Sequence, residues 1–335
     1  MIMLWIKVAT AGLLLLGLGG HTQLQNKEEP PVETSSGMRT GAGSSVIQAE
    51  EIAEALIRQE YDQVYNQTSE PFREMISAAD FAKAVQSFSS DVKTWNPNSD
   101  LKVNGGRYIT WANPEGTKGL IAQLGPDGII AGLQMVPLKQ FPQTDMAFTQ
   151  QEFSLPVEGD WLVFWGGENV LSNYHYEVKE QRYAYDWIQI RDGYSYDGDP
   201  FKNESYYAFG QKVTAPRDGR VAHVVNDIPD NEPVGTMNPD VPAGNMVVID
   251  HGDGTYSFLA HLKKGSATVK VGDLVAKGDL IGLCGNSGNS SEPHLHVQVS
   301  DHVDLFSGKS LRIKWERGLE PRQGEVVHGK PSINE

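Results

Sequence analysis

The first hydrophobic part of the chain after residue 45 repeats its apolar positions at helical intervals. Residues 47–67 place hydrophobic side chains three or four positions apart, which predicts an amphipathic helix. The residues on its apolar face are Ile52, Leu56, Tyr61 and Val64. A second helix is predicted after Ser77, because a serine followed three positions later by Asp80 is typical of a helix N-terminus.

From residue 101 onward the hydrophobic pattern becomes that of β-strands. Short runs rich in apolar residues are separated by polar turns, and a Pro-Asp-Gly sequence at 126–128 is typical of a hairpin turn. The predicted strands are residues 107–112, 117–124 and 129–136. Helices followed by a meander of strands predict a small α+β domain over residues 47–140.

The C-terminal half predicts a mainly β domain over residues 150–335. Short runs of β-branched and aromatic residues alternate there with glycine-containing turns, and no helix longer than about two turns is expected. The clearest predicted strands are residues 161–164, 246–250 and 256–259. A connector over residues 137–151 is expected to join the two domains.

The N-terminal segment, residues 1–20, carries an export or anchoring signal. Lys7 is its only charge, and an apolar run follows from Val8 to Leu18. The apolar stretch also approaches the length that one membrane span needs, so a cleaved signal peptide and a retained anchor are both open. Residues 21–46 have the composition of a linker. Either alternative predicts an extracellular or cell-envelope location.

Composition and charge exclude several classes of protein. The chain has 335 residues, of which 39% are hydrophobic, so a mainly disordered chain is not expected. It has 43 Asp and Glu against 28 Lys and Arg, a formal net charge of −15, so no nucleic-acid partner is expected. Cys284 is the single cysteine, which excludes an intrachain disulfide and a thiolate-rich structural zinc site.

The histidines gather in the predicted β domain. Eight of the nine follow residue 170, and two of these form a His294-Leu295-His296 sequence. Residues two apart in a strand face the same side, so the two imidazoles are expected on one face, as a metal site requires. His261 follows a predicted strand upstream. Histidine pairs are also common on protein surfaces, so the pattern by itself leaves both readings open.

A series of motifs over residues 165–300 resembles the M23 peptidases, the lysostaphin-like or LytM-type zinc endopeptidases of bacterial cell walls. The motifs occur in the family's order: Ala215-Pro216 with Gly219 and Val221, Ala260-His261-Leu262, residues 275–282, residues 285–288, and Pro293-His294-Leu295-His296. The resemblance implies an antiparallel β-sheet with a groove, of the lysostaphin-like or duplicated hybrid motif type, and one bound Zn²⁺. Residues 47–140 more loosely resemble a nuclear-transport-factor-2-like domain.

The resemblance also implies the site residues. It makes His175, Asp186 and His296 the zinc ligands. It makes His261 and His294 the catalytic histidines that do not bind zinc. Ten residues separate His175 from Asp186, as in one branch of the family, whereas three is the common family spacing.

Two imidazoles and one carboxylate suit Zn²⁺ and leave one coordination position open. Because the chain has no His-Glu-x-x-His motif, the two catalytic histidines are expected to activate water or to stabilise the oxyanion, and the sequence leaves open which residue does which. A family aromatic position is Leu259 here, and this change is expected to alter substrate packing.

The implied function is an exported zinc metallo-endopeptidase that hydrolyses peptide bonds, with peptidoglycan peptides as its substrate. Two alternatives are a catalytically silent M23-like domain that binds wall peptides or regulates another hydrolase, and a zinc peptidase that acts on proteins. Residues 47–140 are expected to be a spacer or docking module, with a ligand pocket as the alternative, and the sequence does not indicate their partner. The sequence also leaves open whether an insertion over residues 193–240 covers the groove. The remaining histidines of this half (His223, His251, His302 and His328) are expected to be structural or exposed, and Cys284 buried.

Overall fold

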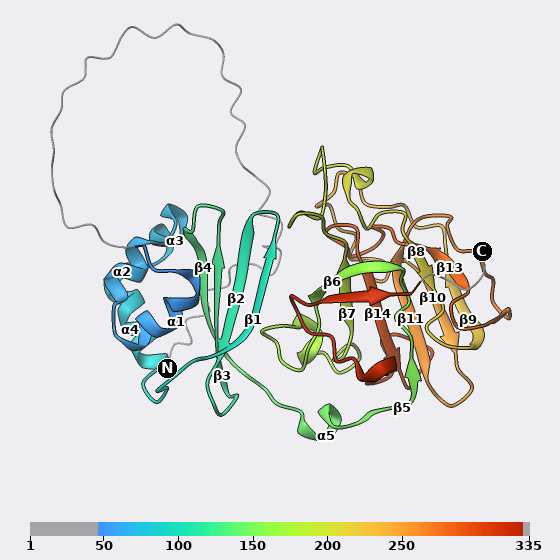
Figure 1. Ribbon diagram of the computed structural model, residues 1–335, viewed down its shortest axis with the longest axis horizontal. Coiled ribbons are helices and arrows are strands. Elements are labelled where there is room, and N and C mark those ends of the chain that lie inside the picture. Colours follow the sequence, from blue (N-terminus) through green and yellow to red (C-terminus); the bar gives the residue numbers. More distant parts are fainter. Residues whose placement is uncertain (1–45, 331–335) are drawn as a thin grey trace, which may run out of the picture.

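The computed structural model describes residues 46–330, which form an N-terminal α+β region and a larger C-terminal β region (Figure 1). The predicted signal segment, residues 1–20, and nearly all of the predicted linker lie outside the described residues. Over residues 46–330 no helix has the length and apolar character needed to cross a membrane.

Short helices open the described chain. After a 3₁₀ turn at Ala49–Glu51 they are α1 (Ile52–Ile57), α2 (Tyr61–Asn66), α3 (Glu70–Met75) and α4 (Ala78–Phe88). The prediction of one helix over residues 47–67 is wrong, because the chain breaks between α1 and α2. Gln59 adopts a left-handed backbone with φ 63°, and the Glu60 amide bonds back to the Ala55 carbonyl. This local arrangement ends a helix.

The predicted start of α4 is confirmed. The Ser77 side chain accepts a hydrogen bond from the Asp80 amide at 3.2 Å, and its hydroxyl donates to the Asp80 carboxylate at 2.7 Å. Ser69 caps α3 in the same manner by accepting from the Phe72 amide. Each serine satisfies an amide that has no partner within its own helix.

The helices cover one face of a four-stranded antiparallel sheet. Its strands are β1 (Asn96–Val103), β2 (Gly106–Ala112), β3 (Lys118–Leu124) and β4 (Ile130–Pro137), paired in chain order. Val64 and Phe81 from the helices pack with Trp111 and Leu120 from the sheet. The predicted α+β architecture is confirmed, and the nuclear-transport-factor-2-like resemblance stays a prediction.

The connector contains more regular structure than predicted. It holds the short helix α5 (Pro142–Asp145) and the strand β5 (Phe148–Phe153), which pairs in parallel with β15 (Ser310–Trp315). The predicted connector over residues 137–151 therefore ends within β5. The strand β5 forms by pairing with β15, which lies about 160 residues further along the chain.

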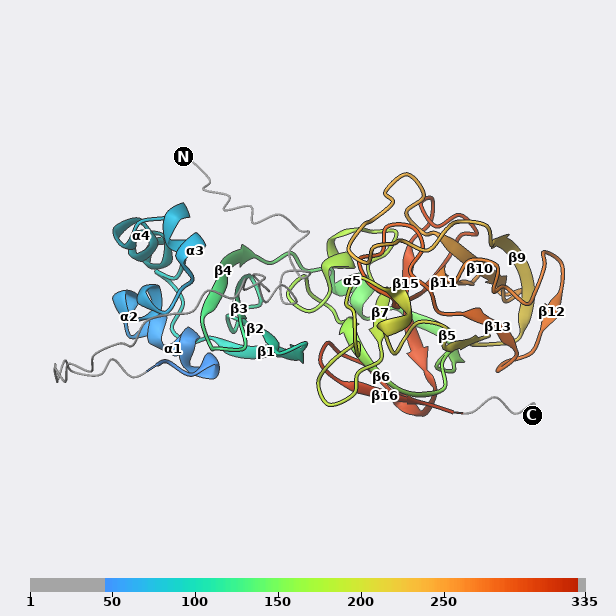
Figure 2. The ribbon, with the colours of Figure 1, turned by 90° about the horizontal axis from the view of Figure 1, so that it is seen from above.

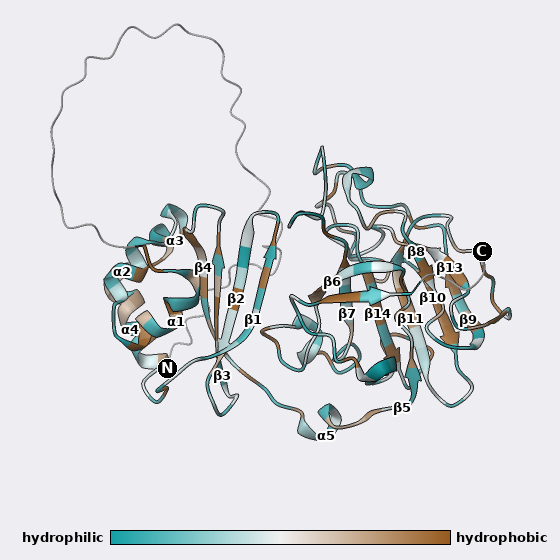
Figure 3. Ribbon diagram, viewed as in Figure 1, coloured by the Kyte–Doolittle hydropathy of each residue, from teal (hydrophilic) through white to brown (hydrophobic). Residues whose placement is uncertain are grey.

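The C-terminal region is built around a mainly antiparallel sheet, as predicted. The strand order is β12-β9-β10-β11-β14-β7-β6-β16, with β15 paired to β14 and β5 paired to β15, and β8 pairs with β13. Hydrophobic residues concentrate on these strands, and the loops are largely hydrophilic (Figure 3). The remaining strands are β6 (Gly159–Trp165), β7 (Tyr185–Ile188), β8 (Lys212–Thr214), β9 (Gly219–Val225), β10 (Asn245–Asp250), β11 (Tyr256–Leu262), β12 (Leu274–Val275), β13 (Leu280–Leu283), β14 (Leu295–Ser300) and β16 (Val326–Gly329).

The two faces of β14 have different surroundings. Leu295 and Val297 belong to the main hydrophobic core, so His296 between them points to the opposite face. Leu259 on β11 pairs with Val297 and is fully buried in the same core. The expectation that Leu259 alters substrate packing is wrong, because its side chain lies on the face away from His296.

The N-terminal sheet is covered on both faces. Its second face packs against the C-terminal region, where Leu101, Tyr108 and Ile121 share a hydrophobic cluster with Leu171 and Ile188. Figures 1 and 2 show this sheet lying between its own helices and the C-terminal strands. At the tip of the β1–β2 hairpin, the Asn104 amide donates to the Gly193 carbonyl at 2.8 Å.

Candidate functional site

Three predicted ligands, His175, Asp186 and His296, meet in the C-terminal region. They form what we call the metal triad, and one donor atom from each lies within 4.8 Å of the other two. The Asp186 carboxylate is 2.9 Å from Nδ1 of His296 and 3.6 Å from Nε2 of His175. All three side chains are buried, with exposures of 1% to 4%.

Strand pairing positions two members of the metal triad. Asp186 on β7 lies directly opposite His296 on β14 in the antiparallel register. Directly opposite residues on one face have neighbouring side chains. His175 comes from a short 3₁₀ turn, Tyr174–Glu177, in the loop that joins β6 to β7. Two ligands are thus held by the sheet and one by a loop.

The Asn173 side chain determines which nitrogen of His175 carries the proton. Its amide nitrogen donates to three backbone carbonyls, those of Gly167, Arg182 and Ala184. Its oxygen therefore accepts from Nδ1–H of His175 at 2.9 Å. The lone pair of His175 is left on Nε2, the atom that faces Asp186.

Gln298 does the same for His296 with the opposite ring nitrogen. Its amide nitrogen donates to the Glu180 carbonyl at 3.1 Å, so its oxygen accepts from Nε2–H of His296 at 3.2 Å. The lone pair of His296 then lies on Nδ1, beside Asp186. A protein partner that fixes the second ring nitrogen is the usual companion of a metal-binding histidine.

The donor set of the metal triad fits a Zn²⁺ ion. Nε2 of His175, Nδ1 of His296 and the Asp186 carboxylate all present lone pairs, with no hydrogen between them. Such acceptors repel one another unless a cation lies between them. Tetrahedral zinc with bonds of about 2.0–2.1 Å places its ligand atoms about 3.3 Å apart, and the observed 2.9 and 3.6 Å bracket that spacing.

The electrostatics of the metal triad keep its ligands in the forms that bind a cation. Burial lowers the pKa of His175 to about 3, so its imidazole is neutral. Burial by itself raises the pKa of the Asp186 carboxyl, but the neighbouring imidazoles of His175, His294 and His296 outweigh it and hold that pKa below its usual range. Metals bind neutral imidazole and ionised carboxylate.

His261 and His294 lie beside the metal triad and form what we call the imidazole pair. Their ring centroids are 4.6 Å apart, and the His261 ring is 5.8 Å from that of His296. Nδ1–H of His261 donates to the Ser287 carbonyl at 2.8 Å, and Nδ1–H of His294 donates to the Glu292 carbonyl at 2.8 Å. Both residues therefore keep the lone pair on Nε2, which for His294 is 3.8 Å from Asp186.

A backbone irregularity brings His261 to the site. Regular alternation along β11 would place residue 261 on the same side as the buried Leu259. His261 instead has a left-handed backbone with φ 60°, and the β10–β11 register shifts next to it. Non-glycine residues rarely adopt this conformation and often lie at functional sites when they do.

Gln298 gives the site a testable contact outside the metal triad. We expect Gln298→Leu to weaken Zn²⁺ binding about 10- to 100-fold, because His296 loses the acceptor that fixes its tautomer. Competition with a chromogenic chelator measures the affinity. Gln298→Glu is the matched control, since it keeps an acceptor oxygen and is expected to bind more tightly than the leucine variant. Equal affinities in the parent and Gln298→Leu would contradict the tautomer assignment.

Glu292, beside the imidazole pair, makes stability depend on pH. Burial raises the pKa of its carboxyl from 4.5 to about 7, against the opposing hydrogen bond with Ser195. Between these pH values the folded protein holds a proton that the unfolded chain releases, so the free energy of unfolding falls as pH rises. Between pH 5 and pH 8 the free energy of unfolding is expected to fall by about 1–3 kcal/mol less in Glu292→Gln than in the parent, since one pKa unit is worth about 1.4 kcal/mol. Guanidinium unfolding of metal-free protein measures it, and identical pH profiles would contradict it.

The other histidines of the C-terminal half and the cysteine lie as expected. His251 is buried, and its ring nitrogens lie 2.8 Å from the Asp218 carbonyl and 3.0 Å from the Ser257 hydroxyl, which confirms a structural role. His223, His302 and His328 are exposed. Cys284 is fully buried in the main core, as predicted.

The predicted insertion over residues 193–240 lies along the loop that leads to His294. The Asn231 amide donates to the Asn286 carbonyl at 2.8 Å, and the Gly235 amide donates to the Ser291 carbonyl at 3.0 Å. At its start, the insertion meets the N-terminal region, where Asn104 accepts from the Ser195 amide at 2.8 Å. The insertion is thus fixed by backbone hydrogen bonds beside the imidazole pair.

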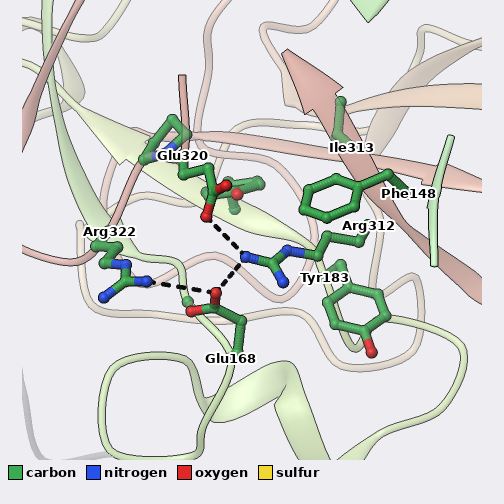
Figure 4. A pocket seen from close by; sticks show the side chains of 10 residues that line it. Phe148, Glu168, Tyr183, Arg312, Ile313, Glu320 and Arg322 are labelled. Carbon is green, nitrogen blue, oxygen red and sulfur yellow. Dashed lines mark hydrogen bonds and ion pairs between the residues drawn. The ribbon is translucent and has the colours of Figure 1, made fainter. Parts of the chain in front are cut away.

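A cluster of charged residues anchors the loop before His175 (Figure 4). Arg312 pairs with Glu168 on that loop and with Glu320 at 3.0 Å, and Arg322 reaches Glu168 at 3.6 Å. The free volume between these residues is about 10 Å³. This is about the space of one water molecule, so the cluster supports the loop and is not a ligand site.

Three further residues at the site were not predicted. Asn173 and Gln298 each lie two positions from a ligand histidine, and Tyr174, next to His175, hydrogen-bonds Asp186. The period of two along β14 placed Gln298 on the same face as His296, so its position was readable from the sequence. Nothing local marks Asn173, because its three carbonyl partners belong to different parts of the loop.

Comparison with known proteins adds a family. Residues 205–307 match Peptidase family M23. This range includes His261, His294 and His296, and it begins after His175 and Asp186, so the match does not extend to those two residues.

The relatives match only part of this chain. An uncharacterized metalloprotease from Buchnera aphidicola is 40% identical over 74 residues, which are 22% of this chain and 19% of that protein. The peptidoglycan DD-endopeptidase ShyA from Vibrio cholerae is 46% identical over 57 residues, 17% of this chain and 13% of that protein. The chain therefore spans less than a fifth of the length of either relative. Among solved structures, the catalytic domain of lysostaphin from Staphylococcus simulans is 25% identical over 35% of this chain and 86% of that domain, with a TM-score of 0.23.

Proposed function

We propose that the protein is an exported zinc metallo-endopeptidase that hydrolyses peptide bonds in peptidoglycan, a proposal supported by the match of residues 205–307 to Peptidase family M23. The observation that carries the proposal is the convergence of the metal triad and the imidazole pair, in which four imidazoles lie together and each keeps a lone pair on one ring nitrogen. The name of the relative ShyA, a peptidoglycan DD-endopeptidase, supports the choice of substrate.

The proposed metal site divides the work between two sets of residues. His175, Asp186 and His296 would hold the cation. When bound, Zn²⁺ polarises a peptide carbonyl and lowers the pKa of water to about 7. Asp186 supplies the one negative charge among the ligands, and Asn173 and Gln298 orient the two imidazoles without adding charge.

The imidazole pair is proposed to move the proton. Both His261 and His294 use Nδ1–H to bind a backbone carbonyl, so Nε2 is available as a proton acceptor. Burial lowers the pKa of His261 well below its usual value, which keeps this imidazole neutral before the reaction. One Nε2 accepts the proton of the attacking water and then donates it to the nitrogen of the leaving amine.

Hydrolysis of purified peptidoglycan tests the proposed function. The full chain loaded with Zn²⁺ is expected to release new amino groups, and the masses of the products identify the bond that is cleaved. Treatment with a chelator is expected to stop release, and added Zn²⁺ to restore it. If the protein binds zinc and cleaves a protein such as casein but releases no amino groups from peptidoglycan, its substrate class is protein and not peptidoglycan. Zinc binding without any cleavage would favour a silent, wall-binding domain.

A further inference from the structure

The predicted ligand His175 lies on a long loop, residues 166–182, which we call the ligand loop. Strand pairing fixes Asp186 but ends ten residues short of His175. Within this loop the regular structure is the short 3₁₀ turn Tyr174–Glu177. Ordering a loop carries an entropy cost for each residue, so contacts elsewhere must hold the His175 imidazole in place.

One such contact joins the ligand loop to the N-terminal sheet. Leu171 is fully buried in a hydrophobic cluster with Leu101, Tyr108 and Ile121 of that sheet. It sits directly against the backbone of β3, since a Cβ atom added to Gly119 would lie 2.6 Å from a Leu171 methyl group. The middle of the ligand loop is therefore packed against the N-terminal region.

Aromatic rings continue this contact to the ligand itself. Tyr108 on β2 packs edge-on against Trp165 at 5.6 Å between ring centroids. Trp165 packs edge-on against Tyr174 at 5.4 Å, and the Tyr174 ring lies 3.9 Å from that of His175. The two edge-to-face pairs lie at favourable distances, and together with the tilted pair of Tyr174 and His175 they form an unbroken series of rings from the N-terminal sheet to His175.

A polar contact links the same two regions. The Asn169 side chain donates to the Asn98 side chain at 2.7 Å, and its oxygen accepts from the Leu171 amide at 2.9 Å. The Asn169 carbonyl accepts from the amide of Asn173, the residue that orients His175. Asn98 on β1 thus holds the turn at Asn169, which in turn holds Asn173 in place beside His175.

The connector holds the far end of the ligand loop. Its Phe141 ring lies 5.3 Å from the Tyr176 ring, and the Tyr176 hydroxyl donates to Asp145 at 2.8 Å. The Arg182 guanidinium lies 3.5 Å from the centre of the Phe141 ring. Figure 1 shows the connector with α5 passing from one region to the other.

We propose that the N-terminal α+β region and the connector act as a scaffold that holds the ligand loop, and through it His175, in the metal-binding position. This inference rests on the proposed function for the metal triad. It gives residues 47–145 a role in forming the site, in addition to any role as a spacer. It also explains how a ten-residue gap between the two ligands is tolerated, because packing replaces the short covalent connection.

Two neighbouring residues of β3 provide a matched test in the full chain. Ile121 belongs to the cluster with Leu171, whereas Leu120 belongs to the cluster with the helices on the other face. Ile121→Ala is expected to weaken Zn²⁺ binding about 10-fold or more, the range seen when a partner of a metal ligand is lost. It is also expected to speed amide hydrogen exchange over residues 171–178. Leu120→Ala is expected to change neither quantity beyond twofold.

The possible results separate the scaffold from the proposed function. The scaffold proposal is wrong if Ile121→Ala leaves both the amide hydrogen exchange of the ligand loop and the Zn²⁺ affinity unchanged. It is also wrong if Leu120→Ala changes these two quantities as much as Ile121→Ala does. Absence of zinc binding by the parent chain overturns the proposed metal triad, and the exchange comparison still decides whether the N-terminal region holds the loop. Should Ile121→Ala fail to fold, Asn98→Ala removes a half-buried contact instead and is expected to shift both readouts in the same direction.

Discussion

Replacing His296 by alanine is expected to abolish tight zinc binding and to lower peptidoglycan hydrolysis by at least about 1,000-fold. The side chain provides one of two neutral donors in a buried triad, and it lies directly opposite Asp186. Its loss leaves two ligands, His175 and the buried Asp186 carboxylate. Metal content after dialysis and the rate of amino-group release measure the two effects.

His223→Ala is the matched control for this variant. It makes the same substitution at an exposed histidine on β9 and is expected to leave both quantities unchanged. Retention of stoichiometric zinc by His296→Ala would show that the metal triad is assigned wrongly. Loss of zinc in both variants would point to a general loss of folding.

Substitution of His261 is expected to separate chemistry from metal binding. His261→Asn removes the Nε2 acceptor and is expected to lower hydrolysis about 100- to 10,000-fold, the usual range for a general acid or base, with zinc affinity within threefold of the parent. Asparagine is chosen because it tolerates the left-handed backbone found at this position, so folding is expected to survive. Steady-state hydrolysis and chelator competition on the same samples measure the two quantities.

His294→Asn is the companion to this experiment. The two residues share the same tautomer and their ring centroids lie 4.6 Å apart, so the variant with the larger loss of hydrolysis identifies the main proton acceptor. A His261→Asn protein that hydrolyses peptidoglycan at the parent rate would remove this residue from the mechanism. Loss of zinc in His261→Asn would instead make it a ligand.

Local sequence patterns were sufficient for the type of most elements. The serine cap at Ser77 and the Pro-Asp-Gly turn at 126–128 depend on neighbouring residues alone, and both were predicted correctly. The helix break at Gln59 was missed, because the apolar positions of α1 and α2 continue through it at helical spacing. The strand β5 was missed for a different reason, since it forms only by pairing with β15, far away in the chain.

The site residues likewise fall into those that the sequence indicated and those that only tertiary contacts determine. The sequence by itself determined that His294 and His296 share a face, because a strand alternates with a period of two, and the family motifs indicated His175, Asp186 and His261. Only the tertiary structure decided that these five residues meet and which ring nitrogen each imidazole presents. The amide partners Asn173 and Gln298, the left-handed backbone of His261 and the packing of the ligand loop on the N-terminal sheet depend on contacts between distant segments. Such contacts form cooperatively on folding, and residue spacing along the chain does not encode them locally.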